Sequence, residues 1–190
     1  MDILNLSFSA SGIIDNYDAA FFRRNLPQTI AALAQTQTKA TEKKILVWAA
    51  GNAHGQSCTT ETYNCENGTI NATSVEILAG MVARIEELQG HSIAVVAVDQ
   101  DGDIADFSNR CGIIAANWCL AAPGENVTVA SSSGRPRARG IGFARGTSFA
   151  APMVSGSLAV MKQLFRDQLP NTALVTRLFN TPKHLSLIHI

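Results

Sequence analysis

Two short stretches place polar side chains where acyl-transfer chemistry could occur. In GTSFAAPMVSG (146–156), Ser148 begins a run of small and apolar residues that predicts a helix to about Phe165. A hydroxyl at a helix N-terminus either caps the helix or acts as a nucleophile, because the free N–H groups there favour developing negative charge. In VWAAGNAHG (47–55), Asn52 follows an apolar segment, and its amide either stabilises a turn or donates to an oxyanion. Neither stretch decides between its two interpretations alone.

Three short apolar segments rich in β-branched residues predict the strands that would position these side chains. They span residues 2–8, 44–50 and 92–98. A helical pattern over 27–40 separates the first two, with Pro27 suited to a first helical turn. Strand, helix, strand in this order predicts an α/β fold with a parallel sheet. Asn52 would then lie at the carboxyl end of a strand, where open α/β sheets place their sites.

The rest of the chain continues this pattern with interruptions. Residues 118–124 and 126–132 predict two more strands, and 75–89 predict a weak helix. Residues 53–74 are rich in Thr, Asn, Gly and Cys, which predicts a long surface loop, and 133–142 predict a mobile loop.

Local signals also predict how the helix after residue 146 begins. Gly146 is expected to take a positive φ angle, and Thr147 or Ser148 to cap the helix. Pro152 is expected in the first turn, where its missing N–H costs nothing.

Composition restricts the class of protein. The chain has 190 residues, of which 46% are hydrophobic and 16% charged, with a net charge of zero. This is typical of one globular domain and excludes a disordered or membrane-spanning chain. Arg135, Arg137 and Arg139 form a short basic loop, interpreted as a solvated turn, so no nucleic-acid partner is expected.

The four cysteines form two close pairs, Cys58 with Cys65 and Cys111 with Cys119. Two local disulfides are favoured, because no CxxC spacing or histidine in register indicates zinc. Zinc and four buried free thiols remain the alternatives. Two disulfides would indicate an oxidising compartment.

Alternating aspartates at positions 99, 101 and 103 resemble the start of a calcium loop. Such a loop needs a glycine where Ile104 stands and a bidentate acid where Arg110 stands. We therefore interpret residues 99–109 as a hairpin turn and assign no metal ligands.

Taken together, five motifs resemble the subtilisin-like serine peptidases in order and in spacing. They are NLSFS (5–9), VWAAGN (47–52), AVVAVDQDGDIADFSNRCG (94–112), CLAAPGENV (119–127) and GTSFAAPMVSG (146–156). The resemblance covers residues 1 to about 181 and concerns the C-terminal part of the catalytic domain. It implies a three-layer subtilisin-like α/β fold with a mostly parallel sheet. Residues 182–190 match nothing and are excluded from the fold prediction as an artefactual tail.

The resemblance also assigns roles to residues. It makes Ser148 the nucleophile of an acyl-enzyme mechanism and Asn52 the side-chain donor to the oxyanion, with the Ser148 N–H as second donor. Segments 6–9 and 49–51 would pair with an extended substrate and wall the pocket for the residue before the scissile bond. Ser9 and Ala10 stand where the family usually has glycines. The substrate-binding residues expected are Ser7, Phe8, Ser9, Ala49, Ala50, Gly51 and Thr147.

The family's catalytic Asp and His come earlier in the chain than its Asn and Ser, so both are expected upstream of Met1. The four histidines here, His54, His91, His184 and His189, match no family motif. These 190 residues alone are therefore expected to have negligible peptidase activity.

The form SNRCG…WCLAAPGENV further resembles the subtilase passenger domains of bacterial autotransporters. This implies a secreted or cell-surface protein that acts on protein or peptide substrates. Its partners would be the N-terminal part of its own domain and a C-terminal β-barrel translocator. The residues identify no cofactor, and the resemblance allows calcium.

Two rival functions remain. An α/β-hydrolase would need GxSxG, but Ala150 stands at the last position of that motif. A catalytically inactive subtilase-like module for binding or maturation fits every motif if the upstream Asp or His is replaced.

Overall fold

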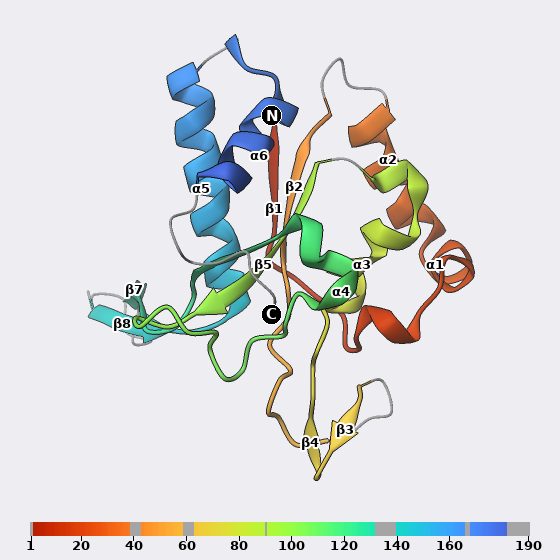
Figure 1. The fold of residues 1–190 in the computed structure, drawn as a ribbon, viewed down its shortest axis with the longest axis vertical. Helices are drawn as coiled ribbons and strands as arrows, with labels where there is room; N and C mark the ends of the chain where they lie inside the picture. The colour runs from red at the N-terminus through yellow and green to blue at the C-terminus, as the bar shows by residue number, and fades with distance from the viewer. Residues whose placement is uncertain are drawn as a thin grey trace.

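A four-stranded parallel sheet forms the middle layer of the computed structural model (Figure 1). Its strand order is β1 (Ile3–Leu6), β2 (Ile45–Ala49), β5 (Ser92–Val98), β6 (Cys119–Pro123), and every pairing is parallel. Helices cover both faces, which confirms the expected three-layer α/β fold. The structure describes residues 2–38, 43–58, 63–89, 91–131, 140–165 and 168–181.

Strand β2 shows why a near-continuous apolar run is needed in this sheet. Successive side chains of a strand point to opposite faces, and all five residues of β2 are buried, so both of its faces are covered. Leu46 and Trp48 pack in one hydrophobic cluster, and Val47 and Ala49 pack in the other. The sheet thus separates two cores, each closed by helices.

The two helical layers are unequal. On one face lie α1 (Ala19–Asn25), α2 (Pro27–Thr38), α3 (Ile77–Arg84) and α4 (Gly112–Ala115), with 3₁₀ turns at Ile14–Asn16, Glu86–Leu88 and Ala116–Trp118. On the other lie α5 (Thr147–Phe165) and α6 (Asn171–Asn180). The sequence patterns predict α2, α3 and α5, whereas α1, α4 and α6 were not predicted. None of the helices in the described ranges is long and apolar enough to cross a membrane.

The prediction of a long surface loop over 53–74 is wrong in its middle. A hairpin forms there from β3 (Cys65–Glu66) and β4 (Thr69–Ile70). Asn67 and Gly68, which connect the strands, both have positive φ, the requirement of a two-residue hairpin turn. Ile70 is 6% exposed because it packs against Ile13 in a third small core. The Asn-Gly pair was the sequence signal for this hairpin.

The predicted mobile loop over 133–142 is also wrong at its end. Residues 140–142 begin β8 (Gly140–Ala144), which pairs antiparallel with β7 (Val127–Ser131). Residues 132–139, with the arginine cluster, and the tail 182–190 lie outside the described residues.

Helix α5 begins differently from the prediction. Gly146 has the expected positive φ of 148°. Thr147 is the first helical residue, so Pro152 lies inside the helix and not in its first turn. Without an N–H, Pro152 cannot donate to the carbonyl of Ser148. The hydroxyl of Ser7 donates to that carbonyl instead, at 3.0 Å, which joins the end of β1 to the start of α5.

Disulfides join Cys58 to Cys65 and Cys111 to Cys119, the two local pairs favoured by their spacing. The first ties the β3–β4 hairpin to the segment after Asn52. The second joins the start of α4 to the start of β6. Each closes a short loop and so restricts the unfolded chain.

The aspartate-rich segment after β5 folds as a tight turn. The side chain of Asp99 accepts hydrogen bonds from the N–H groups of Asp101 and Asp103, and Val98 pairs with Ile104. This agrees with the predicted hairpin turn.

Candidate active site

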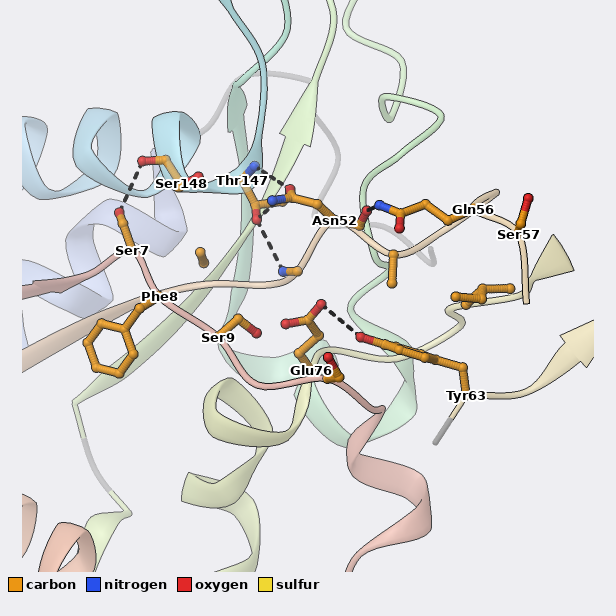
Figure 2. A pocket seen from close by; sticks show the side chains of 15 residues that line it. Ser7, Phe8, Ser9, Asn52, Gln56, Ser57, Tyr63, Glu76, Thr147 and Ser148 are labelled. Atoms are coloured by element: carbon orange, nitrogen blue, oxygen red, sulfur yellow. Dashed lines mark hydrogen bonds between the residues drawn. The ribbon is translucent and has the colours of Figure 1, made fainter. Parts of the chain in front are cut away.

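A cavity of about 360 Å³ opens where β1 and β2 end and α5 begins (Figure 2). This is the edge of a parallel sheet at which α/β proteins bind ligands. It is lined by Ser7, Phe8, Ser9, Ser11, Ala49, Gly51, Asn52, Ala53, Gln56, Ser57, Tyr63, Ile70, Glu76, Thr147 and Ser148.

The hydrogen bonds of Thr147 fix the orientation of the Asn52 amide. The backbone N–H of Thr147 donates to Asn52 Oδ1 at 2.8 Å. Thr147 Oγ1 accepts from the N–H of Gly51 at 3.1 Å and donates to the same Oδ1 at 3.0 Å. Because a backbone N–H can only donate, the atom facing Thr147 must be the amide oxygen. The Nδ2 group of Asn52 is therefore left to donate elsewhere.

Asn52 Nδ2 and Ser148 Oγ face the same hollow. Both lie close to the point that a β-carbon on Gly146 would occupy, Ser148 Oγ at 3.0 Å and Asn52 Nδ2 at 3.5 Å. A side chain at position 146 would crowd both groups, so the glycine keeps the space in front of the hydroxyl and the amide open. Ser148 is the second residue of α5, where α-helical geometry provides no acceptor for its N–H. A hydroxyl, a side-chain amide and a backbone N–H thus converge at the positive end of a 19-residue helix.

Asn109 holds the segment that carries Asn52. Its Oδ1 accepts from the N–H of Ala53 at 2.8 Å, and its own N–H donates to the carbonyl of Gly51 at 3.0 Å. The side chain is fully buried. Asn109 therefore positions Asn52 from both sides. Sequence reasoning missed this role, although FSN belongs to a motif that carries the resemblance.

Six of the seven predicted substrate-binding residues line the cavity, and Ala50 does not. Ala50 is fully buried and packs in the core beneath α3. Its N–H donates to Val95 and its carbonyl accepts from Glu76, so its backbone is already paired. The alternation that turns Ala49 toward α5 turns Ala50 away from the cavity.

A family model described as the subtilase family, peptidase S8, matches residues 1–186. The chain belongs to the subtilase family.

Individual relatives of this subtilase are more distant. Serotype-specific antigen 1 of Mannheimia haemolytica is 38% identical over 112 residues, which are 57% of this chain and 12% of the antigen. The self-cleaved protease domain of PatA has a TM-score of 0.60 at 24% identity, covering 97% of this chain and 55% of that one. The MycP3 protease from the type VII (ESX-3) secretion system has a TM-score of 0.60 at 25% identity, covering 96% and 48%. The subtilase chain thus spans about half of each solved structure and a small part of the antigen.

The two described histidines of the subtilase chain do not line the cavity. His54 Nδ1 accepts from the N–H of Ala72 at 3.1 Å, and burial lowers its pKa. His91 is buried, immediately before β5. His184 and His189 lie outside the described residues. Within the described ranges, no histidine faces Ser148 across the cavity.

Glu76 is a cavity residue that sequence reasoning missed. It is 6% exposed, and its Oε1 accepts from the hydroxyl of Tyr63 at 3.2 Å. Burial raises the pKa of its carboxyl to about 7, although hydrogen bonds from Tyr63 and the backbone of Asn52 act in the opposite direction. Gly51 makes room for this carboxyl, because a β-carbon there would collide with the Glu76 side chain. No local pattern around SVEIL marked this glutamate.

The raised pKa of Glu76 makes the free energy of unfolding depend on pH. The folded carboxyl keeps its proton up to about pH 7, whereas the unfolded one loses it near its ordinary pKa of 4.5. Ionisation of the buried carboxyl therefore lowers the free energy of unfolding. This loss is absent below pH 4.5, grows as pH rises, and is complete above pH 7 at about 3 kcal/mol. Glu76→Gln stays neutral and keeps an acceptor for Tyr63, so we expect it to be the more stable protein at about pH 8 and equal to the wild type at about pH 4.

Denaturant unfolding of the full-length protein at the two pH values measures this difference. Glu86→Gln is the matched control, because it removes an exposed carboxylate from the 3₁₀ turn Glu86–Leu88, outside the cavity. Parallel stability-versus-pH curves for the wild type and Glu76→Gln would contradict the prediction.

Proposed function

We propose that the full-length protein is a serine endopeptidase in which Ser148 forms an acyl-enzyme. The observation that carries this proposal is the shared hollow of Ser148 Oγ and Asn52 Nδ2 beside Gly146. Membership of the subtilase family supports the same chemistry.

The proposed reaction uses each of the converging groups once. Ser148 Oγ attacks the scissile carbonyl and transfers its proton to a general base as the Oγ–C bond forms. The carbonyl oxygen becomes negative and accepts hydrogen bonds from Asn52 Nδ2 and the Ser148 N–H. Collapse of this intermediate breaks the C–N bond, and the departing amine takes the proton. Water then cleaves the acyl ester and restores Ser148.

The general base is proposed to come from a part of the domain outside these 190 residues. The family resemblance and the half-length coverage of the related structures support this. The same reasoning predicts negligible peptidase activity for the isolated chain.

The substrate is proposed to lie along the segment that follows β1. Ser7, Phe8 and Ser9 line the cavity on one side, and Ala49 and Gly51 line it on the other. A peptide extended between these segments would place one side chain in the cavity and its carbonyl at Ser148.

Export to an oxidising compartment is also part of the proposal. The Cys58–Cys65 and Cys111–Cys119 disulfides support it, because such bonds persist outside the reducing cytosol. The relation to serotype-specific antigen 1 is compatible with the autotransporter subgroup. A β-barrel translocator and calcium ions remain proposals by family resemblance alone.

Labelling of the full-length protein with a fluorophosphonate probe tests the proposed function. We expect covalent modification located at Ser148 by peptide mapping, and no modification of heat-denatured protein. A folded full-length protein that stays unlabelled would overturn the proposal in favour of an inactive subtilase-like binding or maturation module.

A further inference from the structure

Glu76 places a carboxyl group directly beside the groups proposed to act on the scissile bond. A β-carbon on Gly51 would lie 2.7 Å from Glu76 Oε1, and Gly51 immediately precedes Asn52. In Figure 2 the carboxyl of Glu76 lies between Ser9 and Tyr63, with Asn52 above it. A side chain that enters the cavity next to Ser148 would therefore meet this carboxyl.

The carboxyl has polar neighbours but no counter-ion in the described part of the chain. Tyr63 donates to Oε1, and no lysine, arginine or histidine acts on its pKa. Among the described residues that line the cavity, Glu76 is the one whose side chain can be charged below about pH 10. A buried carboxylate without a cation is costly, so a cationic ligand that reaches it would gain a strong charge-assisted hydrogen bond.

The cavity lining also offers surface for the rest of a long basic side chain. Ala49, Ala53 and Ile70 contribute apolar groups to it, and Phe8, which also lines the cavity, is 56% exposed. Lysine and arginine carry a stem of methylene groups that packs on such surface and a charged head that needs a partner.

We infer that Glu76 makes this cavity selective for a lysine or arginine side chain in the residue before the scissile bond. The inference rests on the proposed function, because it assumes that Ser148 is the attacking group. It goes further by naming the class of peptide that is cleaved.

The selectivity depends on pH in a defined direction. Tyr63 is the titratable group that faces Glu76 in the described residues, and its own pKa is raised by burial. Glu76 has a pKa of about 7, so the carboxyl is ionised at pH 8 and protonated at pH 5.5. The preference for a basic residue is therefore strong at about pH 8 and lost by about pH 5.5.

Matched peptide substrates test the inference on the full-length protein. One pair compares lysine with norleucine before the scissile bond, which removes the cationic head group. The other compares arginine with citrulline, which removes the charge at nearly constant shape. We expect kcat/KM at about pH 8 to favour the cationic member by about 10- to 100-fold, the value of a hydrogen bond between charged groups. Titration of the general base changes kcat/KM of both members of a pair by the same factor, so it does not affect their ratio. A wild type that prefers the neutral member would overturn the inference.

Glu76→Gln is expected to bring both ratios close to one at every pH. Glu66→Gln is the matched control, because it removes a carboxylate from the exposed β3 strand and should keep the wild-type ratios. Glu76→Asp keeps the charge and should retain part of the preference. Unchanged ratios in Glu76→Gln would overturn the inference.

Two further measurements separate this inference from the proposed function. Fluorophosphonate labelling counts competent Ser148 in each variant, so an unfolded variant is recognised before its ratios are read. Binding of the fluorescent amidinium p-aminobenzamidine needs the carboxylate but no catalysis. If the wild type binds p-aminobenzamidine but does not react with the fluorophosphonate, and Glu76→Gln does not bind, the peptidase proposal alone is refuted. A labelled wild type that does not bind the amidinium would refute the selectivity alone.

Discussion

Ser148→Ala is expected to reduce the turnover of peptide substrates by the full-length protein by about a million-fold, the loss that subtilisin shows without its nucleophile. The change removes Oγ, so neither the acyl-enzyme nor its ester can form. The methyl group that remains fits the space already occupied by the serine side chain. The backbone of α5 and the Asn52–Thr147 hydrogen bonds do not involve Oγ. Substrate binding should therefore persist in this variant.

Steady-state hydrolysis of a fluorogenic peptide and binding of the same peptide measure the two effects. Ser157→Ala is the matched control, since it removes an exposed hydroxyl from the same helix. It should hydrolyse the peptide as the wild type does. Hydrolysis by Ser148→Ala at more than a hundredth of the wild-type rate would place the nucleophile elsewhere.

Asn52→Ala is expected to lower kcat by about 100- to 1000-fold, which is the loss measured in subtilisin for its own oxyanion-hole asparagine. The amide of Asn52 is already oriented by Thr147, so its Nδ2 donates without reorganisation when charge develops on the substrate oxygen. KM should change little, because this hydrogen bond strengthens in the transition state and not in the bound substrate.

Asn52→Asp separates the lost donor from a disturbed loop. It keeps an oxygen to accept from Thr147 but presents a carboxylate in place of Nδ2, so its kcat should be at least as low as that of Asn52→Ala. Asn117→Ala removes an exposed amide elsewhere and serves as the control. A rise in KM with unchanged kcat would show that Asn52 binds substrate in its ground state and does not stabilise the oxyanion.

Much of the fold follows from local pattern. The strands β2 and β5 were predicted because an apolar run without interruption is required of any strand buried on both faces. The hairpin of β3 and β4 was missed because each strand has only two residues, too few to show a period. The Asn67–Gly68 turn was the one local signal for this hairpin. Helix α4 has four residues and no side-chain cap, so it carries no signal of its own.

The start of α5 shows the limit of prediction from local pattern, because its residues were identified but their positions in the helix were not. A proline normally belongs in a first helical turn, and Pro152 is tolerated deeper because Ser7, 141 residues away in sequence, supplies a hydrogen bond to the carbonyl of Ser148. Thr147 or Ser148 was expected to cap the helix, yet the hydroxyl of Thr147 bonds to Gly51 and Asn52 across the site. Partners so distant cannot be read from a local pattern.

The sequence by itself determined which reactive groups are present and on which elements they lie, a serine at the start of a helix and an asparagine after a strand. The order of the motifs also determined the family. Only the tertiary structure decided that Thr147 turns the Asn52 amide toward Ser148, that Ala50 faces away, and that Glu76 stands in the cavity. The reason is physical. Residue type and spacing set what a side chain can do and on which element it lies, whereas the burial and hydrogen-bond partners that set its direction and its pKa come from segments far apart in the chain.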